Sequence, residues 1–166
     1  MTPQRALEQL LNIRVSGVGA VGSLVMIQFG ELRQVSDNKG GTKSIGEFAI
    51  HLSCAWRITR NDSIIAGFGD WEFRESEHRQ TKVEPRFKSL VHQRLTSLDQ
   101  DCSSHKHFVQ SIEIGVAGAF ALQCSDFLRV EVAPMTSYDD VEYWRLLQPE
   151  SEEPHFVVGF DGFELV

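Results

Sequence analysis

Two Trp-Arg dipeptides, Trp56-Arg57 and Trp144-Arg145, each lie in a run whose apolar pattern predicts a β-strand. Side chains alternate along a strand, so an arginine faces solvent where the tryptophan beside it faces the core. Two outward guanidinium groups on one sheet face, together with His51, could hold a carboxylate or phosphate bidentately. The alternative, which we favour, is that each arginine pairs with a cross-strand acid such as Glu131 or Glu142. The candidate ligand-binding residues are Arg57, Arg145 and His51.

A second group of residue types would suit a metal. Cys102, His105 and His107 form the pattern C-x-x-H-x-H, and thiolate and imidazole are zinc ligands. A closed zinc site also needs a fourth ligand, such as Asp99 or Asp101, and a rigid scaffold. Residues 99–107 are polar and predict a loop. We therefore expect a solvated loop here, with no metal and no cofactor.

Two further sets of residues are candidates for catalysis. Cys54 and His51 are three apart on one predicted strand and so point to opposite faces, which argues against a nucleophile–base pair. Acids gather between residues 70 and 77 and could serve acid–base chemistry or a hard cation, but basic residues lie among them. We expect a solvated connector and assign no catalytic residue. The acids are Asp70, Glu72, Glu75 and Glu77, followed by His78.

Residues 17–22 spell G-x-G-x-x-G, the spacing of a dinucleotide-binding loop. Such a loop leads into a helix whose N-terminus holds the pyrophosphate. Here residues 23–29 are branched and apolar and end at Gly30, which predicts a strand instead. We interpret the glycines as hairpin residues that need positive φ.

The net charge of −7 is unevenly distributed along the chain. Residues 126–166 hold ten acidic and two basic side chains, whereas residues 1–125 hold 13 and 14. Such an acidic field repels nucleic acid and attracts cationic partners, although it would also suit a solvated loop that aids solubility. The predicted partner-binding residues are Asp139, Asp140, Glu142, Glu150, Glu152 and Glu153.

The composition indicates a single domain, with 42% apolar residues and with 11 Phe, 3 Trp and 2 Tyr for its core. No apolar run approaches the roughly 18 residues of a membrane span, and the first residues lack the apolar stretch of a signal peptide. Three cysteines are too few, and odd in number, for a disulfide framework. We therefore expect a cytoplasmic protein that binds neither membrane nor nucleic acid.

The elements that must position these residues follow from the apolar periodicity. It predicts an α+β fold: antiparallel sheets of about eight or nine strands, with two main helices packed against them. Thr2-Pro3 and Glu84-Pro85 each suit a helix start, whereas residues 34–46 form a polar loop. Residues 48–59 alternate over six apolar positions and predict one long strand. The other strands are expected at 13–18, 23–29, 63–68, 109–116, 120–124, 127–133, 141–147 and 155–160.

The two halves of the chain, 1–83 and 84–166, present similar elements in the same order. Each has a helix started by proline, a hairpin turned by glycine, a long strand, a Trp-Arg pair and a closing strand. We hypothesise an internal duplication of an α-β4 unit, in which two small units share one core. Trp56 and Trp144 would then occupy equivalent buried places about a pseudo-two-fold axis. Chance similarity of short strands is the alternative, because the offset between matching segments drifts from 82 to 96.

Residues 48–58 (FAIHLSCAWRI), 142–147 (EYWRLL) and 155–158 (HFVV) resemble a group of small uncharacterised bacterial proteins. Some members of such groups look like immunity proteins that neutralise a neighbouring toxin. The resemblance covers about a third of the chain and transfers no catalytic motif. It implies a bacterial, cytoplasmic protein of unassigned function. The first functional hypothesis is a non-enzymatic protein-binding module, an immunity-type inhibitor that uses the acidic segment 137–153 against a basic partner. The second hypothesis is a small-ligand-binding protein or enzyme that uses the arginine- and histidine-lined sheet face.

Overall fold

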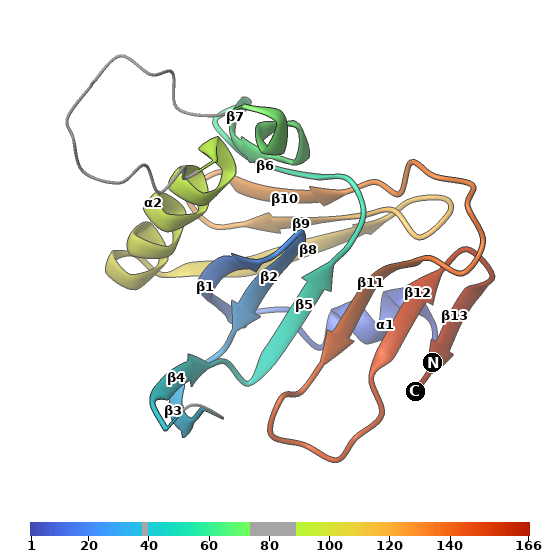
Figure 1. Cartoon of the computed structure of the whole chain (residues 1–166), viewed down its shortest axis with the longest axis horizontal. Coiled ribbons are helices and arrows are strands. Elements are labelled where there is room, and N and C mark those ends of the chain that lie inside the picture. Colours follow the sequence, from blue (N-terminus) through green and yellow to red (C-terminus); the bar gives the residue numbers. More distant parts are fainter. Residues whose placement is uncertain (38–39, 74–88) are drawn as a thin grey trace.

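The structure of the chain is a computed structural model that describes residues 1–37, 40–73 and 89–166 (Figure 1). Within these residues it has thirteen strands, two α-helices and one 3-10 helix, so the α+β prediction is confirmed and the predicted number of strands is too low. The helices are α1 (Pro3–Glu8), η1 (Phe68–Glu72) and α2 (Leu90–Ser104). The strands are β1 (Arg14–Val21), β2 (Leu24–Phe29), β3 (Arg33–Ser36), β4 (Thr42–Ile45), β5 (Phe48–Leu52), β6 (Trp56–Arg60), β7 (Ser63–Gly67), β8 (His107–Ile114), β9 (Phe120–Cys124), β10 (Leu128–Val132), β11 (Glu142–Leu147), β12 (Phe156–Gly159) and β13 (Gly162–Leu165).

Eleven of the described strands form one antiparallel sheet, in the order β13-β12-β11-β5-β2-β1-β8-β9-β10-β6-β7. The two central strands, β1 and β8, join only briefly, through Arg14 opposite Phe108 and Val15 opposite His107. The two halves of the sheet meet again across the core. Trp144 of β11 lies edge-on to Phe120 of β9, with ring centroids 5.0 Å apart, and fills the space between them.

The strand order outward from the β1–β8 junction is similar in the two directions. On one side β1 is followed by β2, β5, β11, β12 and β13, and on the other β8 is followed by β9, β10, β6 and β7. The first side therefore takes three strands from each half of the chain, and the second takes three from the second half and two from the first. Trp56 lies opposite Val132 and Trp144 opposite Leu52, and both tryptophans are buried.

Both α-helices bury an apolar stripe in the same core. The Thr2 hydroxyl accepts from Arg5 N at the start of α1, as the N-cap signal predicts. The predicted start of the second helix at 84–85 lies outside the described residues. At its other end, α2 continues to Ser104 through residues predicted to be a loop, because Leu98 and Cys102 extend its buried stripe by one turn. Among the described residues no helix is both long and apolar enough to cross a membrane.

The predicted strand over residues 48–59 is wrong, because the chain crosses there from one half of the sheet to the other. β5 pairs with β2 and β11, whereas β6 pairs with β10 and β7. Cys54 stays buried in the crossing, so the apolar alternation runs on through the break. The predicted loop at 34–46 contains the β3–β4 hairpin, and β13 has no counterpart in the prediction.

The glycines of the G-x-G-x-x-G pattern have a simpler role than a nucleotide loop. Gly17 and Gly19 lie inside β1, and only Gly22, in the turn to β2, has positive φ (59°). A strand, β2, follows the turn, so no helix N-terminus faces the glycines. The expectation of positive φ is therefore wrong for Gly17 and Gly19, which are strand residues.

Candidate functional site

A hollow of about 410 Å³ opens over β11, β12 and β13, the strands at one edge of the sheet. Gly159 and Gly162, which lie opposite each other and carry no side chains, line it. Phe160 and Phe163 lie at its rim, each about half exposed. The acids that line this acidic hollow are Asp140, Glu142, Asp161 and Glu164.

Only one of these acids is neutralised. Arg145 Nε donates to Glu142 Oε1 at 2.7 Å, and Arg145 Nη2 donates to Oε2 of the same carboxylate. In the described part of the chain no basic side chain forms an ion pair with Asp140, Asp161 or Glu164. The hollow is therefore a concave surface with three uncompensated carboxylates.

The predicted partner-binding acids do not form one patch. Asp139 and Asp140 precede β11, whereas Glu150, Glu152 and Glu153 follow it in the loop to β12 (Figure 1). A strand of six residues separates the two groups by roughly 17 Å. Of the predicted set, only Asp140 and Glu142 line the acidic hollow.

Asp161 and Glu164 line the same hollow but were missed from the sequence. They lie on either side of Gly162, at the turn from β12 to β13 and on β13 itself. The string Gly159-Phe160-Asp161-Gly162 between two apolar runs is a hairpin signal. From that signal the sequence would have predicted a further strand beside β12, with both acids on or next to it.

The three predicted ligand-binding residues are divided between the two halves of the sheet. Arg145 and His51 lie opposite each other on β11 and β5, whereas Arg57 lies on β6, opposite Glu131. Burial, followed by the charge of Arg145, lowers the pKa of His51 below its ordinary value. The expected single face of two arginines and a histidine is therefore not formed.

Both arginines are paired: Arg57 with an acid on the neighbouring strand, as the favoured alternative predicts, and Arg145 with Glu142 on its own strand. Arg57 Nε lies 2.5 Å from Glu131 Oε2, and Arg145 binds Glu142 and also approaches His155 Nδ1 at 3.1 Å. A bound anion would have to compete with these carboxylates. Neither guanidinium is thus a free anion-binding group.

Arg57 does border a second hollow, with a volume of about 550 Å³. Its floor includes Ala121, which lies in register between Glu113 and Glu131. Arg129 bridges these two acids, at 2.6 Å from Glu113 and 3.4 Å from Glu131. Charges around this hollow are therefore balanced, in contrast to the acidic hollow.

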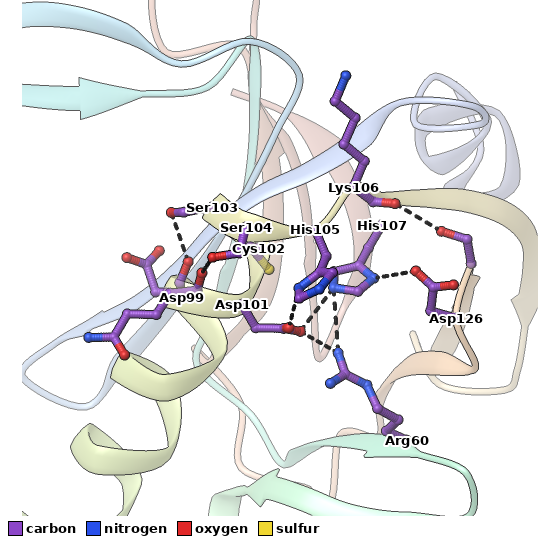
Figure 2. Close-up of polar contacts among 12 residues, drawn as sticks. Arg60, Asp99, Asp101, Cys102, Ser103, Ser104, His105, Lys106, His107 and Asp126 are labelled. Atoms are coloured by element: carbon purple, nitrogen blue, oxygen red, sulfur yellow. Dashed lines mark hydrogen bonds and ion pairs between the residues drawn. The ribbon is translucent and has the colours of Figure 1, made fainter.

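Figure 2 shows a polar cluster where the end of α2 meets β6 and β8. Asp101 Oδ2 lies 2.5 Å from Arg60 Nη2 and 2.9 Å from His107 Nε2, and Asp101 Oδ1 lies 2.9 Å from His105 Nδ1. On its other side His107 Nδ1 lies 3.5 Å from Asp126 Oδ2. His107 is only 2% exposed, so it ties elements together and offers no accessible base.

The C-x-x-H-x-H residues do not converge on a common point. Cys102 is buried in the core, His105 is exposed, and His107 is buried at the start of β8. Asp99 Oδ1 accepts from Val18 N at 2.9 Å and so is used in holding α2 to β1. In the residues that the structure describes, no group of three or more His, Cys, Asp or Glu side chains could hold a metal ion.

The remaining candidates for catalysis are also engaged elsewhere. All three cysteines are free and buried, and burial raises the pKa of each thiol to about 12. Thiolate is therefore scarce at neutral pH. Asp70 accepts from Gly67 N at 2.9 Å at the start of η1, while Glu75, Glu77 and His78 lie outside the described residues.

Comparison with known proteins adds no family to these observations. No family model, no curated protein and no solved structure matches the chain. The resemblance to bacterial immunity proteins therefore stays a prediction, and the geometry of the acidic hollow is the basis for a functional proposal.

Proposed function

We propose that the protein is a non-enzymatic binding module that holds a basic protein partner, as an immunity-type inhibitor would. The acidic hollow carries this proposal, because Asp140, Asp161 and Glu164 have no ion-pair partner in the described residues. A lysine or arginine of the partner would form charge-assisted hydrogen bonds with them. Phe160 at the rim supplies a face for cation–π contact. Binding there would cover the partner's own site.

The state of the other reactive groups supports binding over catalysis. The thiols are buried with raised pKa values, His107 is enclosed, and Arg57 and Arg145 are paired. Free cysteines also agree with a reducing compartment. We therefore include a location in the bacterial cytoplasm in the proposal.

The second group of acids has a lesser part in this proposal. Glu150, Glu152 and Glu153 lie at the far end of β11 from Asp140. They increase the negative field that attracts a basic partner, without contacting the residue that enters the acidic hollow. Because they carry the same charge in a different place, they provide a matched control.

A two-step experiment tests the proposal. Tagged protein is used to capture partners from lysate of its native host, and the bound proteins are identified after washes at low and high salt. Association rates of the captured partner are then compared for two triple variants with equal charge change. One is Asp140→Asn, Asp161→Asn and Glu164→Gln, and the other is Glu150→Gln, Glu152→Gln and Glu153→Gln.

We expect one stoichiometric basic partner that salt releases, and a clear difference between the variants. The hollow variant should weaken affinity by about tenfold or more per buried ion pair, whereas the control should slow association by a few fold. Failure to capture a basic partner, or equal affinity loss in both variants, would contradict the proposal.

One observation favours a second candidate function. The 550 Å³ hollow beside Arg57 has a size suited to a small ligand. Its charges are paired, so a ligand with both a carboxylate and a cationic group would suit it better than a simple anion. A thermal-shift screen of zwitterionic metabolites tests this function. A stabilising ligand whose effect is lost in Arg57→Gln would support it.

We also propose that the two halves of the chain arose by duplication of one unit. Because residues 48–59 form two strands, this unit would hold a helix and five strands in place of the predicted α-β4. The mirrored strand order supports this, as do matching irregularities in register. β1 and β8 each have a bulge, one between Val15 and Gly17 and one between Val109 and Ser111. Next to each bulge, Gln28 lies opposite Gly17 and Gln123 lies opposite Ser111. Chance similarity of short strands would not predict such agreement.

A further inference from the structure

The edge strand β13 offers unpaired backbone groups beside the acidic hollow. It ends the sheet, and no described strand pairs with its outer side. Val166 both donates to and accepts from the backbone of His155. Backbone hydrogen bonds to the neighbouring strand alternate along an antiparallel strand. The N–H and C=O groups of Glu164 therefore also face β12, whereas those of Phe163 and Leu165 point outward. These outward groups form a template for another strand.

The side chains of β13 give this edge two chemically different faces. Phe163 and Leu165 lie opposite Val158 and Phe156 on the core side, and each remains 51% exposed. The Phe163 ring stacks on Phe156 with centroids 5.7 Å apart, so the apolar core surface continues to the edge. Glu164 projects from the opposite face and lines the acidic hollow.

We propose that β13 pairs with an extended segment of the basic partner, in which apolar and cationic residues alternate. Apolar residues of that segment would lie beside Phe163 and Leu165, and cationic residues would lie beside Glu164 and Asp161. This inference rests on the proposed function and specifies how the partner is held. A second copy of this chain fits less well, since it would bring Glu164 and Asp161 close to their own counterparts.

The direct test uses the whole chain and a peptide of alternating lysine and valine, seven residues long. The control peptide has the same sequence with N-methylated valines, which keeps its charge and removes half of its backbone donors. Amide hydrogen exchange is followed by NMR with and without each peptide. With saturating lysine–valine peptide, exchange at Phe163 and Leu165 should slow by about tenfold or more. The N-methylated peptide should give little protection.

A pair of variants separates backbone pairing from side-chain contact. Leu165→Pro removes an outward N–H and no bond to β12, and proline is tolerated on edge strands in this orientation. Leu165→Ala removes the same side chain and keeps the N–H. The proline variant should bind the peptide about tenfold more weakly than the alanine variant. Circular dichroism and thermal melting check that both fold, and Phe163→Pro with Phe163→Ala serves as the second pair.

The outcomes distinguish this inference from the proposed function. Equal binding of both peptides, equal affinity of the proline and alanine variants, or no peptide binding up to roughly 1 mM would each overturn strand pairing. If a captured basic partner leaves Phe163 and Leu165 unprotected but depends on the acids of the hollow, the proposed function stands and strand pairing fails. If no basic partner is captured at all, the proposed function fails as well.

Discussion

At the scale of single residues, Asp101 links three elements through one carboxylate. It binds Arg60 from β6, His107 from β8 and His105 next to its own helix. Burial alone would raise the pKa of Asp101, but hydrogen bonds from Arg60 and His107 outweigh burial and lower it. The ionised carboxylate is thus the form that the folded state favours, and stability should depend on its charge.

Asp101→Asn should lower the free energy of unfolding by about 1–3 kcal/mol at pH 7, because Arg60 and the buried His107 lose a charged acceptor. A carboxylate with a lowered folded pKa stabilises above its unfolded pKa, near 3.9, and loses this effect as pH falls through the folded value. The difference between wild type and variant should therefore shrink below about pH 4. Urea denaturation of wild type and variant at pH 7, 5 and 3 measures this difference in stability. A difference independent of pH would contradict this role, and Asp126→Asn, at an exposed position, serves as the milder control.

Removing Arg145 and removing Glu142 should move the pKa of His51 in opposite directions. Arg145 lowers the pKa of His51 and Glu142 raises it, on top of the lowering by burial. Arg145→Gln should therefore raise the pKa of His51, and Glu142→Gln should lower it further. NMR titration of the His51 ring protons measures both. A shift in the same direction for both variants would show that rearrangement, rather than charge, controls this histidine.

At the scale of elements, glycines that look alike in the sequence have different structural demands. Gly19 lies within β1, where an added Cβ would meet no atom within 4 Å. Gly118, in the turn between β8 and β9, has a φ of +79°, and an added Cβ would lie 2.7 Å from Val158 Cγ1. Its carbonyl also accepts from Trp144 Nε1 at 2.7 Å, so this turn joins the two halves of the sheet.

Gly19→Ala should leave the protein as stable as wild type or stabilise it by about 0.5–1 kcal/mol, because glycine in a strand costs chain entropy. Gly118→Ala should destabilise it by about 1–3 kcal/mol through backbone strain and the clash with Val158. Thermal melting of both variants makes the comparison. Equal stability of the two would mean that the turn relaxes without cost.

At the scale of the whole molecule, the two halves of the chain exchange strands. β6 and β7 of the first half pair beside β10, and β11 and β12 of the second half pair beside β5. Trp56 and Trp144 lie on exchanged strands and are buried in the shared core. Neither half can therefore complete its part of the sheet alone.

Fragments 1–83 and 84–166 should fail to form stable monomers when produced separately, because the first lacks β11, β12 and β13 beside β5 and the second lacks β6 and β7 beside β10. When mixed or co-expressed, they should assemble one to one and recover a cooperative melt. Gel filtration and circular dichroism follow both properties. A single fragment that melts cooperatively as a monomer would contradict strand exchange as the basis of stability.

Local patterns in the sequence determined much of what is observed. The N-cap at Thr2, the alternating strand β10, and the pairing of Arg57 and Arg145 with nearby acids all follow from neighbours within a few residues or directly across a strand. Period-two alternation identifies the buried face of a strand because it reports on burial alone. For the same reason it predicts neither which strand is adjacent nor where the chain crosses from one half of the sheet to the other.

Only the tertiary structure decided the composition of the candidate site. It divided residues 48–59 between the two halves of the sheet, and so separated Arg57 from His51 and Arg145. It also placed Asp161 and Glu164 beside Asp140 and left the acids after β11 at the far end of that strand. Backbone hydrogen bonds between strands are the same for every residue except proline, so strand order depends on how the whole core packs and not on any one segment.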